Sequence, residues 1–235
     1  MRPPDTPIPE LPDPTALCEG ELAKSRKTRI RILNAARDLL ADRGYRRFST
    51  PAVAGRAGLS RPAMLYHFPS RLELLTALIH YLVRRRIEMF EAAMSALPMT
   101  PSFKGQPTRA AAIDVSWRLL ETPEFAAFTE LLVAARTDPE LDAIVRPALA
   151  AFDRSRRETT ERVLPPGSYD LDDLQLVRDV VRFLTEGVVQ QNSLVEDRDR
   201  RLAALRHFLH MLAASTAGNQ FLEAVVADWT ARQPG

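Results

Sequence analysis

The sequence lacks the residues that covalent cross-links, cysteine metal sites and membrane spans require. Cys18 is the only cysteine among 235 residues, so an internal disulfide and a cysteine metal cluster are excluded. No segment reaches the ~18 uninterrupted apolar residues of a membrane span. The proline-rich N-terminus has no apolar core of the kind that signal peptides carry. We therefore expect a cytoplasmic protein that folds around its own hydrophobic core.

Catalytic signatures are also missing. There is no strained nucleophile turn of the kind that hydrolases use. His207 and His210 lie on one helical face, but their spacing supplies no third ligand for a metal ion. Asp170, Asp172 and Asp173 are typical of a helix start, where negative charge complements the helix dipole. We predict a protein that is not an enzyme, needs no cofactor and holds no metal.

Charge, by contrast, is abundant and unevenly distributed. Residues 21–86 contain 15 Lys+Arg and 4 Asp+Glu, residues 1–20 contain 1 and 4, and residues 87–235 contain 16 and 22. A basic segment of this kind favours a polyanionic partner such as duplex DNA, because contacts with phosphate release counterions. The alternative is a solvated, arginine-rich surface. The first basic residues form either an arm towards the DNA backbone or part of that surface; they are Lys24, Arg26, Lys27 and Arg29.

Apolar residues recur at helical spacing, and no alternating run of useful length appears, so we predict an all-α fold. Residues 1–20 are predicted to be a disordered, proline-punctuated tail. Residues 21–69 should form a three-helix DNA-binding domain, with helices that begin at Glu21, Ser49 and Ser60. A helical regulatory and dimerisation domain should follow over residues 70–235, entered through a connecting helix at 70–96. Its further helices are expected at 108–121, 123–136, 139–163, 171–193, 198–216 and 220–230.

The stretch from Ala57 to Phe68 has the composition of a helix-turn-helix motif. Gly58 can adopt the turn conformation without steric cost. The apolar residues Val53, Leu59, Met64 and Phe68 can pack inward and hold the last helix against the one before it. Ser49 and Ser60 are good N-caps, each followed by a proline that is tolerated in the first turn.

Four residues of this motif then project outward: Arg61, Ala63, Tyr66 and His67. Arg61 can donate to guanine O6 and N7, and Ala63 can touch a thymine methyl group. Tyr66, His67 and the capping serines suit phosphate oxygens, which fix position without reading sequence. The alternative is a buried helix pair that only looks like a DNA-binding motif, or for His67 an ordinary structural histidine.

At these residues the chain resembles the TetR family of bacterial transcriptional regulators. The resemblance covers about fifty residues with the expected spacing. It is carried by Ile32-Leu33-x-Ala35-Ala36, Gly44-Tyr45, Ser49, Val53-Ala54, Ala57-Gly58-Leu59-Ser60, Tyr66-His67-Phe68, Ser70-Arg71 and Leu74-Leu75. It implies that the third helix enters the major groove and that Arg71, which opens the fourth helix, holds a phosphate. The DNA-binding residues predicted in this way are Ser49, Thr50, Ser60, Arg61, Pro62, Ala63, Tyr66, His67 and Arg71.

Two positions depart from the family pattern. Leu65 stands where the family usually has an aromatic residue, most often tyrosine, so one expected DNA contact is missing. Pro62 stands where small or polar residues are common, and it should change which edge of the helix faces the bases. Both departures bear on the operator sequence rather than on DNA binding itself.

Two apolar stripes near the C-terminus indicate helices that pack side by side. The resemblance implies that such helices form a four-helix bundle across a twofold axis, and a dimer would present two recognition helices to a palindrome. The alternative is that the stripes face the subunit's own core. The predicted interface residues are Leu174, Val177, Val181, Leu184, Val188, Leu202, Leu205, Leu209 and Leu212.

The resemblance also implies a small-molecule pocket in the C-terminal domain, with an apolar effector fitting slightly better than a charged one. Pockets are typically apolar with a few convergent polar atoms, although aromatic residues at helical spacing are more often plain core. The candidates are Trp117, Phe125, Phe128, Leu132, Arg136, Phe152, Phe183 and Gln190.

Together these features predict a homodimeric, DNA-binding transcriptional regulator, and more specifically a repressor that a small-molecule effector releases from a palindromic double-stranded DNA operator. The alternatives are a regulator that senses no effector, an activator, or an all-α enzyme or adaptor that has kept a basic head.

Overall fold

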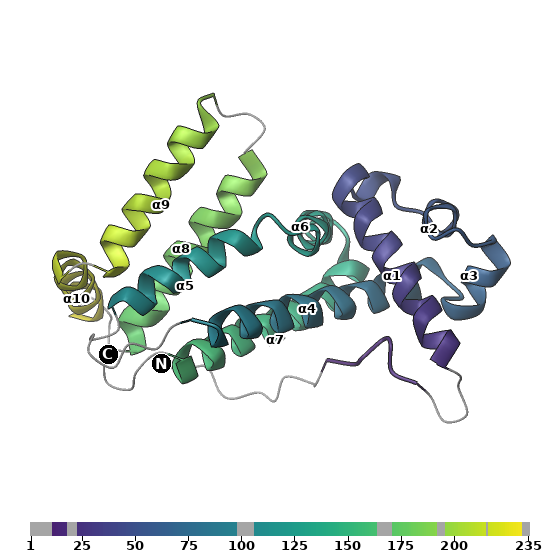
Figure 1. Ribbon diagram of the computed structural model, residues 1–235, viewed down its shortest axis with the longest axis horizontal. Helices are drawn as coiled ribbons and strands as arrows, with labels where there is room; N and C mark the ends of the chain where they lie inside the picture. The colour runs from purple at the N-terminus through teal and green to yellow at the C-terminus, as the bar shows by residue number, and fades with distance from the viewer. Residues whose placement is uncertain are drawn as a thin grey trace. The chain divides into compact units, whose positions relative to one another are not determined.

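The computed structural model describes residues 11–17, 23–97, 106–163, 171–191, 196–214 and 216–231, which form helices and connecting turns without a strand. The all-α prediction is confirmed for these residues. The helices, shown in Figure 1, are α1 (Ala23–Arg43), α2 (Thr50–Arg56), α3 (Arg61–His67), α4 (Arg71–Ser95), α5 (Gln106–Leu119), α6 (Pro123–Ala135), α7 (Pro139–Val163), α8 (Leu171–Gln191), α9 (Arg198–Ala214) and α10 (Thr216–Ala231), with a short 3-10 helix η1 (Tyr45–Arg47). Among the described residues, no helix has the length and the apolar character that crossing a membrane requires.

The chain divides into two compact units. Unit 1 comprises Met1–Met89 and Glu121–Arg157, and unit 2 comprises Phe90–Leu120 and Glu158–Gly235. Helices α4 and α7 each contribute residues to both units. This division groups residues that pack together, so each unit contains two separate chain segments. The boundaries predicted from the sequence instead divide the chain into consecutive segments, 21–69 and 70–235. Those boundaries stay a prediction.

Unit 1 is built around one hydrophobic core. Helix α1 packs against α2 and α6, and α2 packs against α3. Leu33, Met64 and Leu78 are among its fully buried side chains, and they come from α1, α3 and α4. Burial of this kind stabilises a fold by about 25 cal/mol for each Å² of apolar surface removed from water. Helices α1, α2 and α3 are therefore held by the same core as α4.

Local signals set the ends of the first helices. Helix α1 ends before Gly44, whose φ of 72° is the left-handed conformation that glycine adopts at little cost. Ser49 and Ser60 cap α2 and α3 by accepting the backbone N–H of Ala52 and Ala63, each at 3.3 Å. Both helices carry proline in the first turn, where a missing N–H is harmless. The predicted capping residues are confirmed, whereas η1 was not predicted.

Residues 11–17, which the sequence places in a disordered tail, lie against unit 1. The Leu11 side chain packs on the core, and Thr15 is buried. The Arg84 side chain of α4 donates to the Leu11 carbonyl at 3.2 Å, and Arg29 of α1 donates to the Ala16 carbonyl at 2.6 Å. These bonds connect the segment to two helices, which its proline content alone did not indicate.

A carboxylate inside the same segment adds to its attachment. Asp13 accepts hydrogen bonds from the Thr15 N–H at 2.8 Å and from the Thr15 hydroxyl at 2.7 Å. Burial alone would raise the pKa of Asp13, but these bonds, together with the nearby Arg84 and Arg26, lower it below its ordinary value. The carboxylate is therefore charged at neutral pH.

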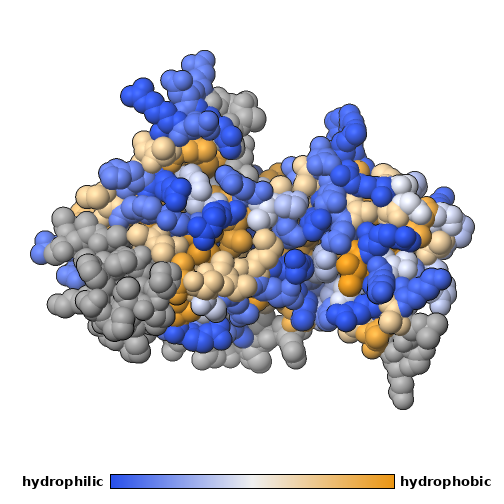
Figure 2. Space-filling model, in the orientation of Figure 1, coloured by the Kyte–Doolittle hydropathy of each residue, from blue (hydrophilic) through white to orange (hydrophobic). Residues whose placement is uncertain are grey.

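Unit 2 packs α5 against α8 and α9, and α10 against α8 and α9. One of its clusters centres on Ile113, Val181 and Leu209 of α5, α8 and α9. Another centres on Phe90, Met94 and Val115 of α4 and α5. Figure 2 shows a hydrophilic tip at the start of α9, with more hydrophobic residues below it over α5 and the lower part of α9.

Candidate DNA-binding surface

The outward face of the α2–α3 motif is polar and accessible. Arg61, Pro62, Ala63 and Tyr66 are exposed, and the Tyr66 side chain is 82% accessible to solvent. A large aromatic side chain with this exposure is available to a partner, because nothing within the subunit covers most of its surface. The ring of His67 lies edge-on to that of Tyr66, with centroids 5.2 Å apart. Arg61, Ala63 and Tyr66, which are predicted to contact DNA, are thus accessible on α3, and His67 is half-buried beside Tyr66.

Hydroxyl groups flank this face at the starts of both helices. The oxygens of Ser49 and Ser60 accept backbone N–H groups of their own helices. Each hydroxyl still has a hydrogen to donate, and a phosphate oxygen is a suitable acceptor. Thr50 follows Ser49 at the first position of α2 and is half-buried.

The inward residues of the motif lie where the sequence predicts them. Val53, Met64 and Phe68 are buried in the core of unit 1, and Leu59 packs against it. Leu65, at a position where the family usually has an aromatic residue, is half-buried and also packs on this core. A side chain that packs inward in this way contributes to the stability of α3 rather than to the accessible face.

Arg71 opens α4 beside an aromatic platform. Its guanidinium carbon lies 4.9 Å from the centroid of the Tyr45 ring and 5.8 Å from that of Phe48. Arginine over an aromatic face is attracted by the ring's negative π surface. Arg71 itself is exposed, so its charge is accessible to a phosphate from the outer side.

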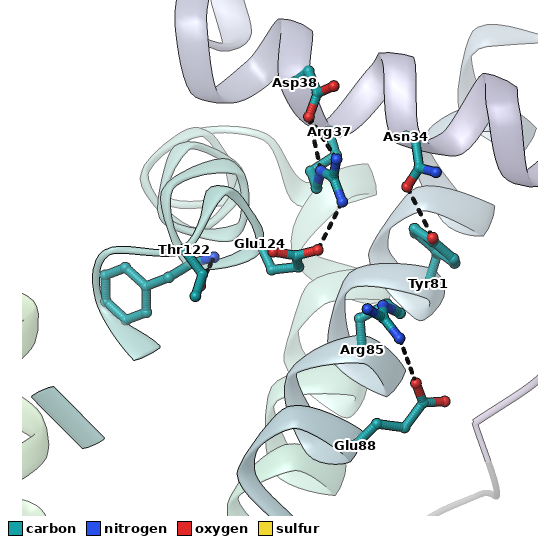
Figure 3. A network of polar contacts seen from close by, with 9 residues as sticks. Asn34, Arg37, Asp38, Tyr81, Arg85, Glu88, Thr122 and Glu124 are labelled. Carbon is teal, nitrogen blue, oxygen red and sulfur yellow. Dashed lines mark hydrogen bonds and ion pairs between the residues drawn. The ribbon is translucent and has the colours of Figure 1, made fainter. Parts of the chain in front are cut away.

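Polar contacts fasten α1 to α6 and to α4 (Figure 3). Arg37 of α1 donates to Glu124 of α6 at 2.7 Å and to its neighbour Asp38 at 2.8 Å. Burial alone would lower the pKa of Arg37, but the Asp38 and Glu124 carboxylates raise it, so the guanidinium keeps its charge. Glu124 is buried, and this pairing meets the requirement that a buried charge have a partner.

A second polar contact joins α1 to α4. The Tyr81 hydroxyl of α4 donates to Asn34 Oδ1 of α1 at 2.9 Å. Burial raises the pKa of Tyr81, so the phenol stays protonated and remains a donor at neutral pH. Sequence spacing alone does not reveal either contact, because the partners lie far apart in the chain.

The predicted effector residues lie in both units. Phe125, Phe128 and Phe152 are buried in unit 1, where Leu132 packs on the core and Arg136 is exposed at the end of α6. Trp117 packs half-buried on a core cluster of unit 2, Phe183 of that unit is exposed, and the Gln190 side chain lies outside the described residues.

The three buried rings surround an arginine that the sequence analysis missed. The guanidinium carbon of Arg86 lies 4.2 Å from the centroid of Phe152, 4.7 Å from that of Phe128 and 5.2 Å from that of Phe125. Arg86 is buried. The signal was available, because Arg86 continues the helical stripe of buried residues Leu75, Ile79 and Leu82.

The predicted interface residues are placed as follows. Val181 and Leu209 are buried in the core of unit 2, and Val177 and Leu184 pack half-buried against it. Leu209 is 1% exposed, so its surface is used within the chain. Val188, Leu202, Leu205 and Leu212 are half-buried, and the side chain of Leu174 lies outside the described residues.

The histidines near the C-terminus have ordinary surroundings. Asp114 Oδ1 of α5 lies 2.8 Å from His210 Nε2 and 2.7 Å from the Arg206 guanidinium, both of α9. His207 is exposed. Within the described ranges, no group of three His, Cys, Asp or Glu side chains is placed to hold a metal ion.

Comparisons with known proteins agree with this geometry. Residues 32–78 match the model of the bacterial regulatory proteins of the tetR family. An uncharacterized HTH-type transcriptional regulator of Mycobacterium tuberculosis is 24% identical over 188 residues, which are 77% of this chain and 94% of that protein.

Solved structures show the same fold. A TetR-family transcriptional regulator from Streptomyces coelicolor superposes with a TM-score of 0.56 at 19% identity, over 88% of this chain and 90% of that one. The multidrug binding protein EbrR complexed with ethidium superposes with a TM-score of 0.54 at 22% identity, over 80% of this chain and 99% of that one.

The capped α2–α3 pair, its accessible face and the HTH-type relatives define a helix-turn-helix, DNA-binding transcriptional regulator. Within that class, residues 32–78 match the N-terminal domain of the tetR family of bacterial regulatory proteins.

Proposed function

We propose that this regulator is a repressor that binds a palindromic operator as a homodimer and is released by a small-molecule effector. The observation that carries the DNA-binding part is the accessible face of α3, where Arg61, Ala63 and Tyr66 are exposed on a helix whose other side is buried. A helix presented in this way fits the major groove of B-DNA.

The proposed roles follow from side-chain chemistry. Arg61 donates to guanine O6 and N7, and Ala63 touches a thymine methyl group, so these two residues read sequence. Tyr66, His67 and Arg71 contact phosphate oxygens and fix the position of the helix. The hydroxyls of Ser49, Thr50 and Ser60 do the same, while Pro62 sets how the first turn of α3 approaches the bases.

Support for the homodimer comes from exposed apolar side chains on unit 2. Phe183 of α8 is 65% exposed, and Phe208 and Met211 of α9 are 53% and 52% exposed. Exposed large apolar side chains on α8 and α9 suit a protein partner. A second copy as that partner would present two recognition helices to the two halves of a palindrome. The half-buried stripe residues would then lie beside this exposed set.

Support for an apolar, aromatic effector comes from the residues around Arg86 and from a structural neighbour. Phe125, Phe128 and Phe152 gather in unit 1 next to the DNA-binding helices. EbrR, which has the same fold, is described as a multidrug binding protein and was solved with ethidium. A coupling free energy of about 1–3 kcal/mol between effector and DNA is typical of such allostery.

The effector would act by changing the separation of the two recognition helices. This part of the proposal fails if that separation is the same with and without effector. A regulator that senses no effector, or one that activates transcription, is the alternative within the class. An enzyme or adaptor with a basic head is the alternative outside it. We further propose that the protein acts in the cytoplasm, where its DNA target lies.

Selection of bound duplexes from a random DNA library, at two salt concentrations, tests the proposal. Recovery of one palindromic motif that survives the higher salt is the expected result. Recovery of unrelated sequences that are lost at the higher salt would show binding to phosphate alone. The selected operator then serves for effector screens.

Two substitutions separate a regulator from an enzyme or adaptor. Arg61→Ala should reduce discrimination at one base pair by roughly 1–3 kcal/mol. Tyr66→Phe should weaken binding to all sequences alike, because the hydroxyl contacts phosphate. An enzymatic activity would be indifferent to both changes.

A further inference from the structure

We propose that Tyr45 positions Arg71 for its contact with a DNA phosphate, and that Glu130 of α6 holds Tyr45 in place for this task. The inference deepens the proposed function and rests on it, because Arg71 has a phosphate partner only if the protein binds DNA. It adds two positioning residues, Tyr45 and Glu130, that lie outside the motif itself.

The Gly44–Tyr45 turn is attached to α6. The backbone N–H of Tyr45 donates to Glu130 Oε2 at 2.9 Å. A Cβ atom added to Gly44 would lie 2.9 Å from the same oxygen, so the carboxylate sits directly against the turn. Gly44 also has φ 72°, and a side chain there would be strained. Glycine at position 44 therefore leaves room for the Glu130 carboxylate beside the turn.

The Tyr45 ring lies beside the Arg71 guanidinium. Its centroid lies 4.9 Å from the guanidinium carbon of Arg71, and its hydroxyl lies 3.5 Å from Asp138 Oδ2, which precedes α7. One end of Tyr45 is thus bonded to α6, while its aromatic face meets Arg71. An exposed arginine has many rotamers, and a fixed ring beneath the guanidinium restricts them.

Helix α6 contacts the DNA-binding region at two points. Glu124 and Glu130 lie six residues apart on α6 and bind different targets, Arg37 of α1 and the backbone at Tyr45. The Glu124 contact fastens α1, whereas the Glu130 contact leads through Tyr45 to the residue that opens α4. A displacement of α6 would therefore change the support of Arg71 and that of α1 together, whereas a substitution of Glu130 affects only the contact at Tyr45.

The salt dependence of DNA binding tests this inference. Each phosphate that the protein neutralises contributes about 0.9 to the slope of log K against log salt. The full chain would be titrated with the selected operator and with a short duplex of mixed sequence. Arg71→Ala should lower the slope by about 1. Tyr45→Leu should lower the slope by a similar amount, although Tyr45 carries no charge. Tyr45→Phe keeps the aromatic ring and should therefore keep most of the slope of the unmodified chain.

Combining Tyr45→Leu with Arg71→Ala should add nothing to the loss in slope, since both changes remove the same contact. An unchanged slope in Tyr45→Leu, with a lowered slope in Arg71→Ala, would overturn the inference and leave the DNA-binding proposal intact. An unchanged slope in Arg71→Ala would show that Arg71 contacts no phosphate, and this result would also overturn the inference. Absence of binding by the unmodified chain would instead show that the proposed function has failed.

Glu130→Ala, which removes the acceptor of the Tyr45 N–H, gives an independent test if Tyr45→Leu fails to fold. Removal of a negative charge should strengthen DNA binding by general electrostatics, whereas loss of a positioning contact should weaken it. We expect a decrease in affinity of severalfold. Glu140→Ala, which removes an exposed carboxylate of α7 in the same unit, is the matched control and should not weaken binding. Equal effects of the two substitutions would contradict a positioning role for Glu130.

Discussion

Carboxylates play different parts in the two units. In unit 1, Glu124 and Glu130 of α6 point inward and bind α1 and η1, while the accessible surface of α3 is polar and basic. In unit 2, Asp114 joins α5 to α9 through side chains that are partly exposed, while large apolar side chains face outward. Both units thus have apolar cores, and they differ in the burial of the carboxylates that join their helices. The Glu124 carboxylate of unit 1 is buried, whereas the Asp114 carboxylate of unit 2 is partly exposed.

The largest expected effect is on the buried pair of unit 1. Arg37→Ala would leave the Glu124 carboxylate buried without its partner, which should lower the free energy of unfolding by about 3–5 kcal/mol. Arg146→Ala breaks an exposed pair with Asp142 on α7 and should cost less than about 1 kcal/mol. Urea unfolding of both variants at equal concentration measures the difference. Similar losses would show that burial of the pair does not matter.

The next effect concerns the surface of unit 2. Phe208→Glu places a charge among exposed apolar side chains and should dissociate the proposed dimer. Operator affinity should then fall roughly a hundredfold, because the second half-site no longer benefits from a linked partner. Val133→Glu, which changes an exposed apolar residue of unit 1, is the control and should leave the dimer intact. Sedimentation and operator titration check both, and a dimeric Phe208→Glu variant would argue against this surface.

A smaller effect is expected for the polar contact of unit 2. Asp114→Asn weakens the interactions with Arg206 and His210, whose side chains are partly exposed. Solvent screening limits such pairs, so the loss should be at most about 1 kcal/mol. Glu124→Gln should cost distinctly more, which sharpens the contrast between the units. Thermal unfolding of the two variants is the measurement, and the reverse order would contradict the comparison.

The smallest effect is a pH dependence from His80 of α4. Partial burial lowers the pKa of His80 below its ordinary value of 6.5, so the unfolded chain takes up this proton more readily than the folded one. The neutral His80 ring therefore contributes to the stability of the folded chain above about pH 6.5, and this contribution is lost as the pH falls. Because His80 is only half-buried, the change should stay below about 1 kcal/mol. His80→Gln should remove it, as unfolding measured on either side of pH 6.5 would show.

Local chemistry explains what the sequence could predict. Ser49, Ser60 and Gly44 act within a few residues of their own positions, so the helix boundaries around them follow from composition and spacing. The outward position of Tyr66 follows from the period of the buried residues beside it. These features locate the candidate DNA-binding surface without any tertiary information.

Other features depend on contacts between distant parts of the chain. Arg37 and Glu124 lie 87 residues apart, and Tyr45 and Glu130 lie 85 apart, so no local spacing connects them. The attachment of residues 11–17 depends on the carbonyls of Leu11 and Ala16, which every residue type possesses. Arg86 is the exception, because it continues an apolar helical stripe and could have been recognised as a buried cation.

The attachment of residues 11–17 has a practical consequence for work with the protein. Leu11, Asp13 and Ala16 lie against the helices that support the DNA-binding motif, ahead of the region that the family model matches. A chain trimmed to that region would lose contacts with Arg29 and Arg84. Affinities measured on such a fragment would lack these contacts, so biochemical experiments should use a chain that keeps residues 11–17, with any purification tag placed away from them.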